Sequence, residues 1–254
     1  MQATATPPAA ILLDALGTLV ALEPPAPLLR AELARRFGLG VSERQAERAI
    51  AAEIAYYRAH LDDGRDQESL EALRRRCAGV LRSELPAADL ELDPLVDALL
   101  ASLQFTPFAD VRPALVEART RGQRLVVVSN WDVSLHGVLR ALELEPLLDG
   151  IVTSAGAGAR KPAPAIFEQG LTIAGVEPGE AIHVGDSLDE DVAGARSAGI
   201  EPVLVLREPV LPRREPVLVR REPGSTLPGV RTISNLAELA AIGLMRPPAG
   251  PKLV

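Results

Sequence analysis

The chain has 254 residues, 47% of them hydrophobic and 24% charged, so it can bury a sizeable core and is too apolar for a disordered protein. Its 27 basic and 34 acidic residues leave a net charge of -7, which disfavours nucleic acid and anionic membranes as partners and suits a bound divalent cation. The single cysteine, Cys77, excludes an intrachain disulfide, and no apolar run reaches the ~18 residues of a membrane span. The first ten residues lack the features of a signal peptide, so we expect a cytoplasmic protein.

Short apolar runs rich in β-branched residues recur along the chain, and they do not alternate with polar residues. This pattern is typical of strands buried on both faces of a parallel sheet. The runs are residues 11–13, 124–129, 150–154, 181–185, 202–206 and 230–233. Helical patterns separate them at residues 111–120 (with Asp110 placed as a cap), 133–144, 163–174, 191–198 and 236–242. The alternation predicts an α/β fold with a doubly wound, Rossmann-like parallel sheet and a ligand at the carboxyl ends of its strands.

A long helical segment, residues 22–104, separates the first expected strand from the second. It is too long for a plain crossover connection. One apolar stripe ends at Gly38, and Ser42 with Gln45 forms a capping box for the next helix. We predict a small α-helical cap domain over residues 22–104 that lies over the strand ends as a lid, inserted in a core made of residues 10–21 and 105–245.

The rest of the chain is low in pattern or repetitive. Residues 1–9 are predicted to be a disordered N-terminus, and residues 246–254 a C-terminal tail. Three tandem heptads, EPVLVLR, EPVLPRR and EPVLVRR, begin at Glu201, and the proline in every copy excludes a coiled coil. The first copy is expected to be a core strand. Residues 208–223 are expected to be a duplicated loop within the core, with a functional arm as the alternative.

Polar residues stand at the carboxyl ends of four expected elements. They are Asp14 before a glycine turn, the pair Ser129 and Asn130, Lys161 before a helix, and Asp186 with Asp191. Carboxylates with neutral oxygens make the kind of site that Mg²⁺ prefers. A lysine and a serine beside them suit a phosphoryl group, whose charge needs cations and donors. Each motif alone is also common as a turn or a helix cap, so their order along the chain is the stronger signal.

Taken together, these motifs resemble the haloacid dehalogenase-like (HAD) hydrolase superfamily, in the subfamily with a helical cap between its first two motifs. The resemblance covers residues 10–207 and includes the stretches FADVRPAL, VVVSNWD, SAGAGARKPAPAIF and HVGDSLDEDVAGARSAG. It implies that Asp14 is the nucleophile of a covalent aspartyl intermediate, that Ser129 and Asn130 hold the transferring group, and that Lys161 neutralises charge. It also implies a Mg²⁺ ion held by Asp14, the backbone carbonyl of Leu16 and Asp186, with Asp191 orienting the metal's waters or Lys161.

The sequence departs from the family's phosphatase pattern at Leu16, where a second aspartate usually protonates the leaving oxygen and activates water. Loss of such a group typically costs about 10²–10⁴-fold in rate. The DALGT motif instead resembles the dehalogenase branch, in which Asn130 would bind the halide. The acids Asp186 and Asp191 resemble the metal-binding phosphatase form. Dehalogenases also need a cap arginine, and the candidates are Arg30, Arg35, Arg36 and Arg44.

We therefore expect a hydrolase, specifically a Mg²⁺-dependent phosphatase of a small phosphorylated metabolite that is slow or restricted to good leaving groups. The alternatives are a metal-independent dehalogenase of short 2-haloacids and a non-catalytic binding protein with the same fold. Asp132 and Asp189 are acids that could replace the missing aspartate. His183 is expected to be a satisfied core histidine, and Arg160 to steer anions or to be solvated. The oligomeric state is open between monomer and homodimer.

Overall fold

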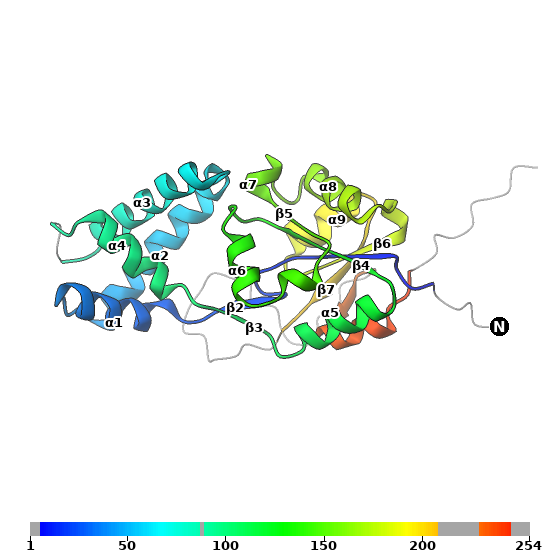
Figure 1. The fold of residues 1–254 in the computed structure, drawn as a ribbon, viewed down its shortest axis with the longest axis horizontal. Coiled ribbons are helices and arrows are strands. Elements are labelled where there is room, and N and C mark those ends of the chain that lie inside the picture. The colour runs from blue at the N-terminus through cyan, green and yellow to red at the C-terminus, as the bar shows by residue number, and fades with distance from the viewer. Residues whose placement is uncertain (1–5, 87–88, 208–228, 245–254) are drawn as a thin grey trace, which may run out of the picture.

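The predicted parallel sheet is confirmed by a computed structural model, which describes residues 6–86, 89–207 and 229–244. Six strands pair in parallel in the order β5-β4-β1-β6-β7-β8 (Figure 1). The strands are β1 (Ala10–Leu13), β4 (Arg124–Ser129), β5 (Gly150–Thr153), β6 (Ala181–Gly185), β7 (Glu201–Val205) and β8 (Arg231–Ile233). The chain moves outward from β1 first on one side and then on the other. This reversal beside β1 is where doubly wound sheets leave a ligand crevice at the carboxyl ends of their strands.

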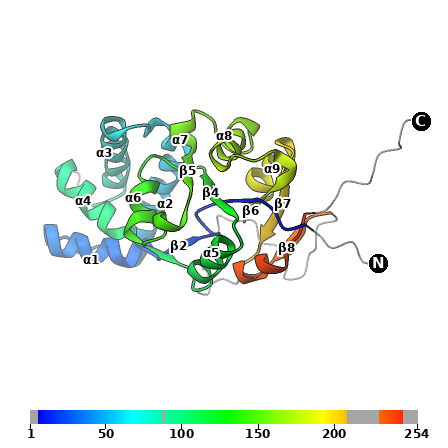
Figure 2. The same cartoon turned by 45° about the vertical axis from the view of Figure 1, so that its right-hand side comes forward.

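Helices cover both faces of the sheet, and alternate residues of β1 point to opposite layers. Ile11 and Leu13 pack into one apolar cluster with the helices α5 (Val111–Thr120), α6 (Leu135–Ala141) and η5 (Leu236–Ala241). Leu12 packs into the other with α8 (Pro164–Ala174) and α9 (Ala193–Ser197). Figure 2 shows α8 and α9 on one side of the strands and α5 on the other. Side chains alternate between the two faces of a strand, and helices cover both faces of this sheet. Both faces of β1 are therefore buried, which explains why its apolar run is continuous.

Four helices lie beyond the carboxyl ends of the strands, at one end of the molecule (Figure 1). They are α1 (Pro25–Phe37), α2 (Glu43–His60), α3 (Gln67–Ser83) and α4 (Leu92–Ser102), all within the predicted residues 22–104, and we call them the cap helices. The expected capping box at Ser42 and Gln45 is confirmed, and Gly38 ends α1 with a φ of 62°. The cap helices enclose an apolar cluster of their own, to which Leu33, Leu73 and Leu99 belong.

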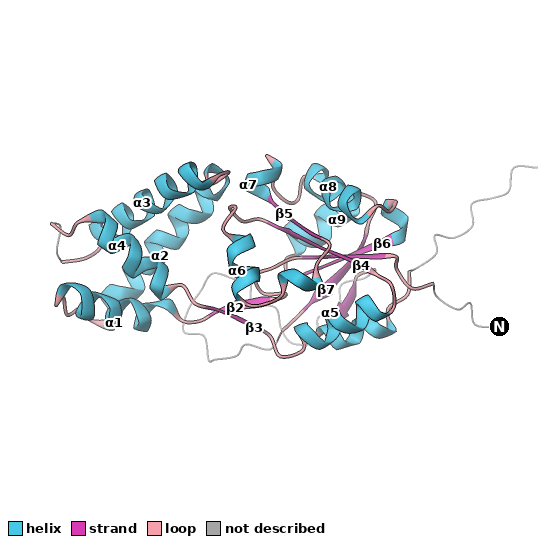
Figure 3. Cartoon of the chain, in the orientation of Figure 1, coloured by secondary structure: helices cyan, strands magenta, loops and turns pink. Residues whose placement is uncertain are grey.

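A short ribbon joins the cap helices to the sheet. Strands β2 (Val20–Leu22) and β3 (Phe105–Pro107) pair antiparallel where the chain enters and leaves the cap, as Figure 3 shows. The sequence analysis did not predict them, because each has three residues and its partner lies more than eighty positions away. The remaining short elements are η1 (Leu61–Asp63), η2 (Glu145–Leu147), α7 (Ser154–Ala157), η3 (Pro178–Glu180) and the π-helix η4 (Leu188–Val192).

Three predicted features of the core differ in the structure. Asp110 does not cap α5: its carboxylate accepts hydrogen bonds from Arg207 and from the backbone N–H of Leu236, which outcompete a local cap. The helix expected over residues 133–144 shortens to α6, because residues 132–134 form a turn in which Asp132 accepts a hydrogen bond from the backbone of Ser134. The helix expected from residue 191 is a π-helical turn followed by α9.

Other sequence expectations lie partly or wholly outside the described residues. These are residues 1–5 of the predicted disordered start, the duplicated loop at 208–223, and the tail at 246–254. Within the described parts of the chain, no helix has both the length and the apolar character that crossing a membrane requires.

Candidate active site

Asp14 stands directly after β1 and is held by residues from two other segments. Its oxygen Oδ1 accepts a hydrogen bond from the Ser129 hydroxyl at 2.9 Å and pairs with the Lys161 ammonium at 2.6 Å. The backbone N–H of Asp14 donates to the carbonyl of Val184 in β6, so the pairing of β1 with its neighbour continues to the aspartate itself. The carboxylate is buried, and its other oxygen, Oδ2, has no hydrogen-bond partner among the described residues.

Lys161 is the cation of the site and is almost completely buried, with 2% of its surface exposed. Its ammonium lies 2.6 Å from Asp14 Oδ1 and 2.6 Å from Asp191 Oδ1. Burial alone would lower the pKa of this lysine, but its attraction to Asp14 and Asp191 outweighs that effect and raises the pKa above its ordinary value. Lys161 therefore remains charged.

Asn130 holds the backbone of Lys161 on both sides. Its oxygen Oδ1 accepts from the Lys161 N–H at 2.8 Å, and its Nδ2 donates to the Lys161 carbonyl at 3.1 Å. In this arrangement the Asn130 amide is occupied with the lysine loop. The sequence analysis assigned Asn130 to the transferring group or to a halide, and both assignments remain predictions.

Asp191 is anchored by three groups and is fully buried. Its Oδ1 accepts from Lys161 and lies 2.8 Å from Nε2 of His183, and its Oδ2 accepts from the backbone N–H of Ser187 at 3.0 Å. Burial opposes the charged form, but Lys161 and His183 hold the pKa of Asp191 below its usual range. His183 is buried as expected, but it is not fully satisfied, because its Nδ1 has no hydrogen-bond partner among the described residues. The contact of this histidine with Asp191 was missed, because nothing in the sequence relates a strand residue to an acid eight positions later.

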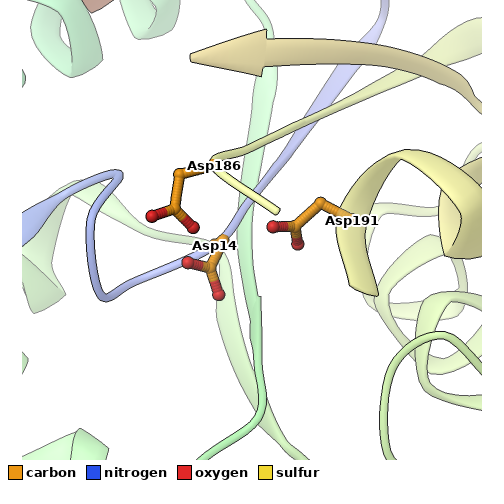
Figure 4. Close-up of side chains that lie close together, drawn as sticks. All are labelled: Asp14, Asp186 and Asp191. Carbon is orange, nitrogen blue, oxygen red and sulfur yellow. The ribbon is translucent and has the colours of Figure 1, made fainter. Parts of the chain in front are cut away.

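Asp186 completes a group of three carboxylates. Asp14, Asp186 and Asp191 each offer an oxygen within 4.8 Å of the others, and Figure 4 shows the three side chains turned toward one another. Burial and then repulsion from Asp14 and Asp191 raise the pKa of Asp186 to about 7. Burial also raises the pKa of Asp14, with Lys161 acting in the opposite direction. The site therefore holds more negative charge than its one lysine can balance.

Gly17 leaves room for the Asp186 carboxylate beside the turn that follows Asp14. It has a φ of 85°, which favours glycine, and a Cβ placed on it would lie 2.1 Å from Oδ2 of Asp186. Gly185 has the same role at the end of β6, since a Cβ there would lie 2.1 Å from Cγ of Asp191. Any side chain at either position would displace a carboxylate of the site.

The side chains fit an oxygen-preferring divalent cation such as Mg²⁺. Three carboxylates converge around a single lysine, and the Asp186 carboxylate has no side-chain hydrogen bond among the described residues. Hard oxygen donors of this kind are the ligands that Mg²⁺ prefers, and the ion would offset the excess negative charge. Asp191 is occupied by Lys161, His183 and Ser187, so it is better placed to orient the lysine than to offer a free oxygen.

The structure thus gathers five of the sequence-predicted residues, namely Asp14, Ser129, Lys161, Asp186 and Asp191, and places Asn130 beside them. Leu16 lies in the turn after Asp14 with its side chain 38% exposed. Arg160 is neither free nor simply solvated, because it pairs with Asp62 of η1. Of the cap arginines, Arg30 donates to the carbonyl of Val41, and Arg35 and Arg36 pair with Glu32.

A doubly wound α/β fold with an aspartate, a serine and a further acid at its strand ends, and a lysine that reaches them from a loop, defines the class of HAD-like hydrolases. The model of that family, the haloacid dehalogenase-like hydrolases, matches residues 8–199, and the chain belongs to this family.

Similarity to individual proteins supports the same assignment. The chain is 46% identical over 92 residues to haloacid dehalogenase-like hydrolase domain-containing protein 3 of Homo sapiens, a match covering 36% of this chain and only 37% of the relative. It is 32% identical over 171 residues to phosphatase MT3486 of Mycobacterium tuberculosis, covering 65% of this chain and 69% of the relative. The solved structure of a HAD phosphatase from Thermococcus onnurineus superposes with a TM-score of 0.59 at 26% identity, covering 91% of this chain and 96% of that one.

Proposed function

We propose that this protein is a cytoplasmic, Mg²⁺-dependent phosphatase that hydrolyses a small phosphorylated metabolite through an aspartyl-phosphate on Asp14. The observation that carries the proposal is the convergence of Asp14, Ser129 and Lys161 with the acid Asp186 in one site of excess negative charge. The phosphatase names of the relatives from Mycobacterium tuberculosis and Thermococcus onnurineus support it.

In the proposed first step, a carboxylate oxygen of Asp14 attacks the phosphorus atom, and the bond from phosphorus to the leaving oxygen breaks. The leaving group departs with the electron pair of that bond. The ammonium of Lys161 and the hydroxyl of Ser129 already contact Asp14, so they are placed to hold the negative charge of the transferring group. Mg²⁺, held by Asp14, Asp186 and the Leu16 carbonyl, would supply positive charge that lets an anionic phosphoryl group approach a carboxylate.

In the proposed second step, water attacks the phosphorus atom of the acyl phosphate. The bond between phosphorus and the Asp14 oxygen breaks, its electron pair returns to the Asp14 carboxylate, and the released dihydrogen phosphate carries both protons of the water. Asn130 and Asp191 act here on Lys161, because the first holds its backbone and the second its ammonium.

Leu16 restricts the substrates of this reaction. Leucine has no proton for the leaving oxygen, and Asp132 is occupied by the Tyr57 hydroxyl and the Ser134 N–H. A leaving group that departs as a stable anion needs no such proton. We therefore propose that acyl and aryl phosphates are hydrolysed faster than alkyl phosphates, whose leaving oxygen is a poor anion.

The test measures phosphate release from acetyl phosphate and p-nitrophenyl phosphate with Mg²⁺ and with EDTA. We expect turnover that requires Mg²⁺ and is absent in Asp14→Asn. Mg²⁺ should also raise the Tm of the wild type and of Asp63→Asn, a cap variant, but not that of Asp186→Asn. Wild-type turnover no higher than that of Asp14→Asn would contradict the proposal. If Mg²⁺ binding then persisted, the protein would be a binding protein with this fold.

A metal-independent 2-haloacid dehalogenase is the second candidate, because Leu16 suits a halide that leaves without a proton. The charge of the site disfavours it. A 2-haloacid carries its own carboxylate, which would meet Asp14, Asp186 and Asp191 with Lys161 as the one cation among them. Chloride release from 2-chloropropionate that persists in EDTA would favour this candidate over the phosphatase.

A further inference from the structure

We propose that Asp62 of the cap is a positioning residue that holds the Lys161 loop in its active arrangement when the cap is docked. The proposal rests on the proposed function, since Lys161 is taken as the residue that holds charge at the reacting group. Among the described residues, Asp62 forms no hydrogen bond or ion pair with Asp14 or Lys161, so its effect would travel through Arg160, the residue before the lysine.

Asp62 holds the lysine loop at two points. Its Oδ1 accepts a hydrogen bond from the Ser154 hydroxyl at 2.5 Å, at the start of α7. Its Oδ2 accepts from Nε of Arg160 at 2.9 Å and lies 2.8 Å from Nη2 of the same guanidinium. Arg160 also donates to the carbonyl of Arg58, at the end of α2, at 3.1 Å. One cap carboxylate therefore binds both ends of the segment that leads from β5 to Lys161.

A second set of contacts docks the same part of the cap on the loop after β4. The backbone N–H of Val133 donates to the Gly64 carbonyl at 3.0 Å, and the Tyr57 hydroxyl donates to Asp132 at 3.0 Å. Gly64 fits closely, since a Cβ there would lie 2.9 Å from Cβ of Asp132. This loop also carries Asn130, which binds the Lys161 backbone. The cap thus contacts two segments that hold Lys161, namely the loop after β4 and the loop that carries Arg160.

The solvent exposure of the ion pair between Asp62 and Arg160 indicates that the pair positions the lysine loop and adds little to folding stability. The side chains of Arg160 and Asp62 are 37% and 40% exposed, and ion pairs this open to water contribute little to folding stability. Lys161, in contrast, is buried and makes two short contacts that depend on where its backbone lies. Small displacements of a group that acts on the reacting atoms have large effects on rate. Loss of the Asp62 contacts should therefore change catalysis much more than stability.

The matched control is the adjacent acid in the same turn. Asp63 pairs with Arg76 within the cap, at 2.7 Å and with exposures of 51% and 41%, and its side chain forms no hydrogen bond or ion pair with the described part of the core. Asp62→Asn and Asp63→Asn therefore remove the same charge from the same turn, and only the first changes the contact with the lysine loop.

Lysine labelling provides a readout that does not need activity. The chain has only two lysines, Lys161 and Lys252, so an amine-reactive reagent followed by mass spectrometry reports on Lys161 directly, with Lys252 as the internal reference. We expect Asp62→Asn to label Lys161 about tenfold faster than the wild type, and Asp63→Asn to label it at the wild-type rate. Hydrogen exchange at the Val133 amide should accelerate in Asp62→Asn alone.

With acetyl phosphate, kcat of Asp62→Asn should fall about tenfold while KM changes by less than about twofold, because the proposed effect of Asp62 travels through Arg160 to Lys161 and not through substrate binding. Asp62→Glu should restore part of kcat, and Asp62→Asn combined with Arg160→Gln should be no worse than the poorer single variant.

Equal labelling and equal kcat in Asp62→Asn and Asp63→Asn, in an active wild type, would overturn the proposal. A wild type without phosphatase activity would overturn the proposed function, while the labelling and exchange results still decide the positioning role of Asp62.

Discussion

The site at the strand ends and the interior of the cap both bury carboxyl groups, but they treat them differently. In the site, Lys161 lies 2.6 Å from Asp14 and from Asp191, and the pKa of Asp191 stays low. In the cap, Glu53 is 3% exposed, and its side-chain partner is the thiol of Cys77. Burial raises the pKa of Glu53 to about 7. At Asp191, Lys161 and His183 thus outweigh the effect of burial, which dominates at Glu53.

The site and the cap interior also differ in whether a change of charge acts on catalysis or on stability. The site keeps three acids together around one cation, an arrangement that is costly for folding unless a metal ion completes it. The cap acid lies in an apolar cluster and has no charged partner in the described chain. Changing the charge in the site should therefore affect catalysis, and changing that of Glu53 should affect only the pH dependence of unfolding.

Removal of the lysine should have the largest effect. Lys161→Met leaves the acids of the site without their cation, and breaking a buried ion pair typically costs about 3–5 kcal/mol in the free energy of unfolding. Phosphatase activity should fall by at least about 10²-fold, since charge stabilisation at the reacting group is lost. Urea unfolding and steady-state kinetics measure the two effects. The control is Lys252→Met, and a Lys161→Met variant as stable and active as that control would contradict the site as described.

Adding an acid beside Asp14 should have the next largest effect. Leu16→Asp places a proton donor two residues after Asp14, and we expect a gain of about 10²-fold in kcat toward alkyl phosphates. Acyl phosphates should gain little, because their leaving group needs no proton. The matched control is Leu16→Asn, which has a similar shape and no acid. An equal gain in both variants would show that the lack of a proton donor at position 16 does not limit the hydrolysis of alkyl phosphates.

The cap acid should have the smallest effect, confined to the pH dependence of stability. Its pKa is 4.5 in the unfolded chain and about 7 in the folded protein, so the folded state binds the proton more tightly. The stability from this group is complete below pH 4.5 and is lost as the pH rises through 7, by about 3 kcal/mol in total. Urea unfolding at pH 5 and pH 8 should show this loss in the wild type and in Glu47→Gln, an exposed acid of the same helix, and a smaller loss in Glu53→Gln. Equal pH dependence in all three proteins would place the titrating group elsewhere.

Local patterns were enough to predict most of the elements. The bounds of α5 and β6 agree with the predicted ranges, and the Ser42 capping box was visible from a serine and a glutamine three residues apart. The alternation of strand and helix patterns indicated a parallel sheet, and acids stood at the ends of its expected strands. These features depend on neighbours within a few positions, so a single sequence contains them.

The three-dimensional fold decided what those residues do. Lys161 meets Asp14 across 147 positions, Arg160 meets Asp62 across 98, and the ribbon of β2 and β3 joins segments on either side of the cap. No local pattern specifies such pairs. The pKa of each acid follows in turn from burial, from Lys161 and from the other charged and hydrogen-bonding groups that the fold places beside it. The sequence by itself determined which chemical groups stand at the strand ends, and the packing of distant segments determined which of them touch and which stay charged.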